Sequence, residues 1–204
     1  MRNGRRVAII YHQAGISPDH LGGRTSLRDR YRDAPTFETM LATVTKNVEL
    51  WTAMWRHARV DEDYVRRVSS LPGRWHLLVL SEDWCGDAVN TVPIVARLVE
   101  RCPNVDMRVL ARDANPDLMD AHLTGGSRSI PVIIVLDEAY EERAWWGPRP
   151  TALQRWVSGQ GQLLEKTARY REARTWYARD RGRTTLDEVV SMLERAASTS
   201  VAAG

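Results

Sequence analysis

A short, almost continuous apolar run from Trp75 to Leu80 constrains the fold more than any other feature of the sequence. Such a run is typical of a central strand covered on both faces, because a strand with one wet face would alternate apolar and polar residues. A helical pattern over 88–101 follows, and a second strand-like stretch covers 105–110. We therefore expect a βαβ unit in a sheet that lies between layers of helices, an α/β arrangement.

The later part of the chain continues the alternation. The patterns predict a short helix over 116–123, a hairpin of strands 132–136 and 143–146, a helix from Thr151, a looser helical stretch through Tyr177, and a last helix from Thr185. Thr185 and Glu188 have the spacing of a capping box. The sheet is therefore expected to be mixed, with helices on both of its faces.

Helices are also predicted before the first strand. Apolar residues recur every three or four positions from Phe37 to Trp55, which indicates one buried helical face, and a shorter helix is expected over 61–70. Residues 12–35 have no such periodicity, so they are expected to be a loop or partly disordered arm. Ser81 and Asp83 are candidate N-caps for the helix over 88–101, and residues 196–204 are expected to fray.

The composition of the chain limits the classes of binding partner that can be expected. The chain has 204 residues, enough for one well-packed domain, and its 29 basic and 26 acidic residues give a net charge of +3 that predicts neither nucleic acid nor a membrane as partner. No apolar run approaches the roughly 18 residues of a membrane span, and we expect a cytoplasmic location. Two cysteines make no disulfide framework, and the five histidines lack metal-ligand spacing, so no metal site is predicted.

The junction between the apolar strand and the next helix carries a motif, Trp84-Cys85-Gly86-Asp87-Ala88. It resembles the redox motif Trp-Cys-Gly-Pro-Cys of the thioredoxin superfamily, with Cys85 at the nucleophile and Ala88 at the resolving position. Pro93 stands where that family has a proline in the following helix, and Pro131 stands where it has a cis-proline before the hairpin. The likeness is greatest to a bacterial branch with a Trp-Cys-Gly-Asp motif, an N-terminal helical extension and a segment like Trp146 to Pro150.

The resemblance implies a thioredoxin-like fold with a definite division of the chain. A flexible arm over 1–35 precedes a thioredoxin-like domain over 36–196, and a tail over 197–204 follows it. Within the domain we expect a helical extension over 36–72, the thioredoxin core over 73–158, and C-terminal helices over 159–196.

The resemblance also implies a site whose catalytic residue is Cys85. Its substrate groove comprises Trp84, Gly86, Asp87, Ile130 and Pro131. A cis bond before Pro131 would let the backbone of Ile130 pair with an extended peptide or with glutathione. Arg128 and Arg149 are candidates for holding a ligand carboxylate, with a solvated surface role as the alternative.

The chemistry expected of this site is altered, because nothing replaces the resolving cysteine. Cys102 lies 17 positions after Cys85, roughly 25 Å along a continuous helix, whereas a disulfide needs Cα atoms within about 7 Å. The buried carboxylate that the family carries on the entering strand is also missing. General dithiol reduction is therefore not expected.

Two functions stay open. One is single-cysteine thiol–disulfide exchange with glutathione or a protein thiol, in which glutathione is a co-substrate and no resident cofactor is needed. The other is a non-catalytic binding module that uses the same groove for a peptide. The helix N-terminus favours a Cys85 thiolate, whereas Asp83 and Asp87 oppose it, so the sequence leaves the direction of the pKa shift open. An iron–sulfur cluster shared between two chains is disfavoured, since Glu82 and Asp87 depart from the motif of single-cysteine glutaredoxins.

Overall fold

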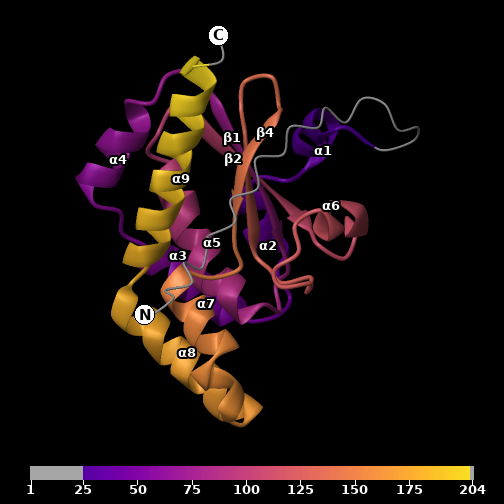
Figure 1. Cartoon of the computed structure of the whole chain (residues 1–204), viewed down its shortest axis with the longest axis vertical. Helices are drawn as coiled ribbons and strands as arrows, with labels where there is room; N and C mark the ends of the chain where they lie inside the picture. The colour runs from indigo at the N-terminus through magenta and orange to yellow at the C-terminus, as the bar shows by residue number, and fades with distance from the viewer. Residues whose placement is uncertain (1–24, 203–204) are drawn as a thin grey trace, which may run out of the picture.

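A computed structural model describes residues 25–202 of the chain. Its centre is a four-stranded sheet in the order β2-β1-β3-β4 (Figure 1). The strands are β1 (Trp75–Ser81), β2 (Val105–Ala111), β3 (Val132–Leu136) and β4 (Glu142–Trp146). β1 runs parallel to β2 and antiparallel to β3, which pairs antiparallel with β4. The mixed sheet and the expected strand positions are confirmed.

Every residue of β1 and β3 is buried, as the apolar runs predict. Figure 1 shows α5 (Gly86–Val99), α3 (Val48–His57) and α9 (Arg183–Ala202) on one side of the sheet. α6 (Pro116–Asp120) lies on the other side. α2 (Phe37–Thr43) lies beside β2, and its Phe37 ring packs 4.9 Å from the Trp55 ring of α3. The sheet therefore has helices on both faces, which is the thioredoxin-like α/β arrangement.

The apolar stripe from Phe37 to Trp55 forms two helices, α2 and α3, where one was expected. The break between them is stabilised by Asp83, whose carboxylate accepts hydrogen bonds from the backbone N–H groups of Thr45 (2.8 Å) and Lys46 (2.9 Å). Asn47, at the N-terminus of α3, takes a left-handed conformation (φ 53°). Asp83 therefore stabilises this break. It does not cap α5, although the sequence indicated it as a candidate N-cap of that helix.

Part of the expected arm is helical. α1 covers Leu27–Asp33, with Ser26 as its N-cap, and buries Tyr31 against the sheet, where the Tyr31 hydroxyl donates to Asp106. Tyr31 and the ion pair of Arg30 with Asp117 (2.7 Å) anchor a segment that has no hydrophobic periodicity, so the expectation of a loop was wrong for these residues. The arm's first 24 residues lie outside the described part. α4 (Glu62–Ser69) forms where it was predicted.

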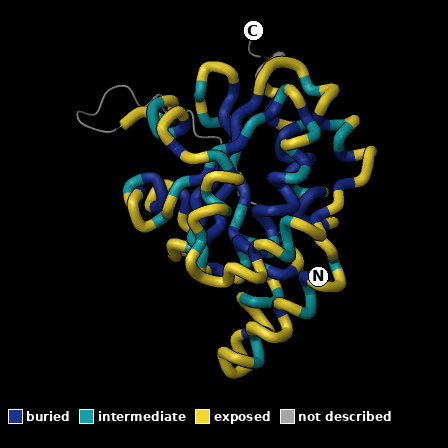
Figure 2. The backbone as a smooth tube through the Cα atoms, turned by 180° about the vertical axis from the view of Figure 1, so that it is seen from behind, coloured by how far each residue is buried: buried dark blue, intermediate teal, exposed yellow. Residues whose placement is uncertain are grey.

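The C-terminal third consists of α7 (Thr151–Ser158), a 3₁₀ turn (Gln160–Leu163), α8 (Lys166–Asp180) and α9. α7 and α8 project from the body of the molecule, and α8 is mostly exposed (Figures 1 and 2). The Trp176 and Tyr177 side chains pack with α7 as a second small core around Leu153.

The start and end of α9 differ from the prediction. The helix begins at Arg183, so Thr185 lies inside it and caps nothing. Glu188 instead accepts hydrogen bonds from the Trp146 Nε1–H (2.7 Å) and the Thr151 backbone N–H (2.8 Å), which ties α9 to β4 and to the start of α7. The tail expected from residue 196 is helical through Ala202, with Ala197 buried.

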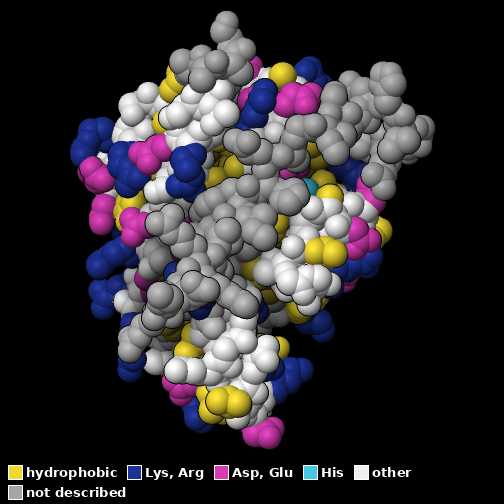
Figure 3. Space-filling view, in the orientation of Figure 1, with side chains coloured by type: hydrophobic (Ala, Val, Ile, Leu, Met, Phe, Trp, Pro, Cys, Tyr) yellow, Lys and Arg dark blue, Asp and Glu magenta, His cyan; other side chains and the backbone are white. Residues whose placement is uncertain are grey.

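Within the described part of the chain, no helix is long and apolar enough to span a bilayer. On the face seen in Figure 3, basic and acidic side chains alternate along the edge formed by α4 and α9.

Candidate functional site

Cys85 lies where β1 passes into α5, and it is the N-cap of that helix. The Ala88 N–H donates to Cys85 Sγ at 3.5 Å, so the sulfur takes the place that an Asp or Ser side chain fills at most helix starts. Gly86 is the first residue of the helix. The position expected from the motif is therefore the one observed.

The thiol is buried, with 7% of Cys85 exposed, and donates a hydrogen bond to the Ile130 carbonyl at 3.3 Å. Burial raises its pKa to about 11; the Ala88 N–H and the nearby Arg149 charge favour the thiolate, while the charge of Asp87 disfavours it. The shift that the sequence left open is upward, because desolvation outweighs the helix terminus. The thiol is therefore protonated at neutral pH.

Asp87 lies in the first turn of α5, and its carboxylate is largely buried. It forms an ion pair with Arg149 at 2.6 Å and accepts a hydrogen bond from the Tyr177 hydroxyl at 2.9 Å. Burial raises the pKa of Asp87, and the Arg149 charge and the Tyr177 hydroxyl oppose that shift. Burial and the neighbouring Asp87 charge also raise the pKa of Tyr177. These three residues connect α5, the segment before α7, and α8.

Gly147 explains how Arg149 reaches the site. It has φ +146°, and a Cβ at this position would lie 2.1 Å from the Pro131 carbonyl oxygen. Only glycine lets the segment after β4 pass this close to the loop before β3. Both the Ile130–Pro131 and Gly147–Pro148 peptide bonds are cis.

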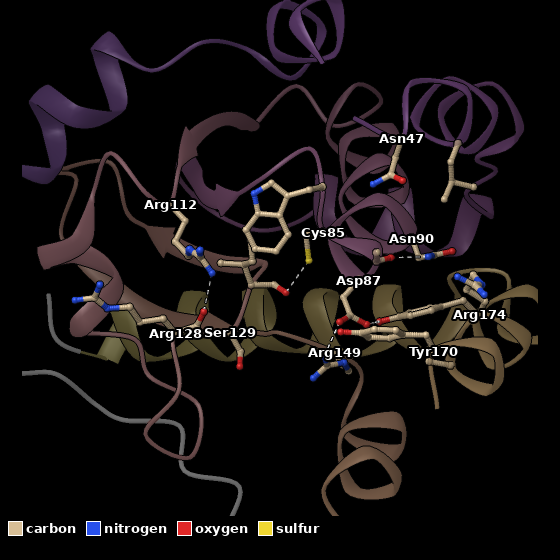
Figure 4. A pocket seen from close by; sticks show the side chains of 16 residues that line it. Asn47, Cys85, Asp87, Asn90, Arg112, Arg128, Ser129, Arg149, Tyr170 and Arg174 are labelled. Carbon is tan, nitrogen blue, oxygen red and sulfur yellow. Dashed lines mark hydrogen bonds and ion pairs between the residues drawn. The ribbon is translucent and has the colours of Figure 1, made fainter. Parts of the chain in front are cut away.

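A pocket of about 420 Å³ opens beside Cys85 (Figure 4). It contains all the groove residues expected from the sequence except Pro131, and both candidate arginines. Its lining residues are Asn47, Leu50, Trp84, Cys85, Gly86, Asp87, Asn90, Arg112, Arg128, Ser129, Ile130, Arg149, Tyr170, Ala173, Arg174 and Tyr177.

The two candidate arginines both have carboxylate partners. Arg128 pairs with Asp120 at 2.6 Å at one end of the pocket, and Arg149 pairs with Asp87. Trp84 is half exposed and forms a wall beside the thiol, with the Arg112 guanidinium 4.9 Å from its ring centre.

The resolving position is filled by the fully buried Ala88, and both cysteines are free. Cys102 lies beyond the opposite end of α5, buried, with its sulfur 3.9 Å from the Val65 carbonyl oxygen. No described group of His, Cys, Asp and Glu side chains could hold a metal ion.

Sequence reasoning did not find the contribution of α3 and α8 to the pocket. Leu50, Tyr170 and Arg174 lie 35 or more positions from Cys85, and no spacing rule joins them to it. The only early signal for this part of the site was the segment from Trp146 to Pro150, which carries Arg149.

Comparison with known proteins agrees with this architecture. A protein of unknown function from Pseudomonas aeruginosa superposes with a TM-score of 0.68 at 18% identity, over 85% of this chain and 100% of the other. An HIV epitope-scaffold superposes with a TM-score of 0.66 at 16% identity, over 83% of this chain and 98% of the other. At sequence identities this low, the similarity shows only that the fold is shared.

No curated protein matches the sequence. The family model described as thioredoxin, however, matches residues 34–171, which is more than half of the chain and includes β1, Cys85 and the loop before β3. The chain belongs to this thioredoxin family.

Proposed function

We propose that this protein is a thioredoxin-fold binding module that takes its ligand in the pocket beside Cys85 and keeps the thiol protonated. The observation that carries the proposal is the state of Cys85 itself. The thiol is buried, donates its proton to the Ile130 carbonyl, and has a pKa raised to about 11. A thiolate is the species that attacks disulfides, so a thiol in this state is a poor nucleophile at neutral pH.

The surroundings of Cys85 add to this argument. Ala88 supplies no second thiol, so a mixed disulfide could not be resolved within the chain. Asp87, the carboxylate whose charge acts on Cys85, is engaged by Arg149 and Tyr177. These contacts fix the side chains that line the pocket beside Cys85. They also leave the Asp87 carboxylate unavailable as a base for the thiol.

Single-cysteine exchange with glutathione or a protein thiol is the second candidate. One specific observation favours it: Cys85 lines the pocket and receives the Ala88 N–H, so a disulfide bound there would meet the sulfur at a helix N-terminus. In this alternative an external thiol would release the product.

The two functions differ in what glutathione disulfide does to the protein. We would incubate the Cys102→Ala variant with glutathione disulfide at pH 7 and follow the intact mass, with Cys85→Ala in the same background as the blank. The binding module predicts that Cys85 stays unmodified over hours. Rapid formation of a mixed disulfide that reduced glutathione removes would overturn the proposal and favour the exchange reaction.

A further inference from the structure

The side of the pocket formed with α8 differs chemically from the rest. We call it the α8 side and define it by Leu50 of α3, Asn90 of α5, and Tyr170 and Arg174 of α8. Figure 4 shows Arg174, Asn90 and Tyr170 together, on the opposite side of Cys85 from Arg112 and Arg128. Arg174 lies beyond residue 171, where the match to the family model ends.

Charge is the first property of the α8 side. Four arginines line the pocket, and three of them are paired with carboxylates: Arg112 with Asp113, Arg128 with Asp120, and Arg149 with Asp87. Arg174 has no carboxylate within ion-pair distance among the described residues, and it is exposed. Its guanidinium can therefore accept an anion without first breaking an ion pair.

Apolar surface is the second property. Seven large hydrophobic side chains are exposed on the described part of the molecule, and three of them line this one pocket: Leu50 (37%) and Tyr170 (49%) on the α8 side, and Trp84 (48%) beside Cys85. Exposed apolar side chains that gather around a concave site mark a place where a ligand is covered. The Lys166 ammonium lies 5.8 Å from the centre of the Tyr170 ring and adds positive charge there.

The third property is that α8 is fixed at this position. The Tyr177 hydroxyl donates a hydrogen bond to Asp87. Ala173, the residue before Arg174 in the chain, packs with Leu153 of α7. The backbone that carries Arg174 is thus already fixed, and only the arginine side chain must be ordered when a ligand binds.

We infer that the α8 side binds a small organic acid, with the carboxylate on Arg174 and the apolar part against Tyr170 and Leu50. A volume of about 420 Å³ suits a small molecule better than a folded partner. Arginine suits a carboxylate because its planar guanidinium can donate two parallel hydrogen bonds. This inference deepens the proposed function by naming the class of ligand.

The test uses two probes of the same shape that differ in charge, 3-phenylpropionate and its neutral amide. Calorimetric titration of the full chain is expected to show about tenfold tighter binding of the acid, the effect of one charge-assisted contact. Arg174→Gln removes this preference. Arg171→Gln, an exposed position on the same helix outside the pocket, keeps it, and circular dichroism checks that both variants fold.

Equal binding of acid and amide, or an unchanged preference in Arg174→Gln, would overturn the inference, as would no binding of either probe at millimolar concentration. Binding of an acidic peptide in place of both probes would assign the site to a different class of partner. Since the probes carry no thiol, these results do not depend on the reactivity of Cys85. A mixed disulfide with glutathione would end the binding-module proposal and leave the acid preference to be judged on its own.

Discussion

Replacing Asp87 with Asn should make Cys85 more reactive even though it weakens the structure around it. The negative charge of Asp87 is one of the causes that hold the pKa of Cys85 up, and the Arg149 charge acts in the opposite direction. In Asp87→Asn the first effect disappears while the second is no longer neutralised. Both changes favour the thiolate.

The size of the effect follows from the proximity of these charges. A charge in the immediate neighbourhood of a titrating group moves its pKa by about 1–3 units, and each unit is tenfold in the thiolate fraction at neutral pH. We take the lower end, because burial remains the largest cause and is unchanged. The alkylation rate at pH 8 should rise about tenfold. Leaving Arg149 without its partner should also cost about 2–4 kcal/mol of stability, since both side chains are largely buried.

Faster alkylation could also arise from local opening of a weakened site, so a second variant is needed. Arg149→Gln breaks the same ion pair but removes the cation that favours the thiolate, so it should destabilise the fold without accelerating alkylation. Asp120→Asn, which removes an exposed carboxylate from the opposite end of the pocket, is the neutral control. The reasoning fails if Asp87→Asn and Arg149→Gln accelerate the reaction equally, or if neither changes it.

Three further changes test other parts of the structure. Ala88→Cys places a second thiol one helical turn from the first, so oxidation with diamide should give a disulfide that dithiothreitol reduces, seen by intact mass, and a dithiol that persists after this treatment would contradict the geometry. Burial alone would lower the pKa of His122, but its hydrogen bond to Glu142 and the charge of that carboxylate raise it. The ion pair therefore stabilises the folded state fully below a pH of about 6.5, the ordinary pKa of histidine, and this stabilisation is lost as the pH rises through the raised pKa of His122. His122→Gln should therefore cost more stability at pH 6 than at pH 9 in urea unfolding, and an equal cost would refute the ion pair. Glu188→Gln should lower the free energy of unfolding by about 1–3 kcal/mol, because the charged acceptor of the Thr151 N–H is lost; no change would show that this contact is not needed.

The sheet and the helix after Cys85 could be predicted from sequence because their signals are local. The apolar run of β1, the hairpin of β3 and β4, and the periodicity of α5 each lie within one short stretch. The predicted helix positions were wrong where a single contact between residues distant in the chain decides the structure. Asp83 breaks the first apolar stripe by binding the Thr45 backbone.

The candidate site shows the same division. Cys85, Trp84 and Ile130 were found because they belong to a motif or stand beside its second element. The network of Asp87, Arg149 and Tyr177 was not found, since its members are 62 and 28 positions apart along the chain and only the fold brings them together. The pKa of Cys85 had the same limitation, because burial, its largest cause, is a property of the packed structure.

The central claim is that Cys85 is a protonated thiol at neutral pH, and the pH dependence of its alkylation tests this most directly. The measurement uses the Cys102→Ala variant, with Cys85→Ala in that background as the blank. We expect the rate to keep rising above pH 9, toward a midpoint near 11. A midpoint at or below the ordinary thiol value of about 8.5 would contradict the account and identify Cys85 as an activated nucleophile.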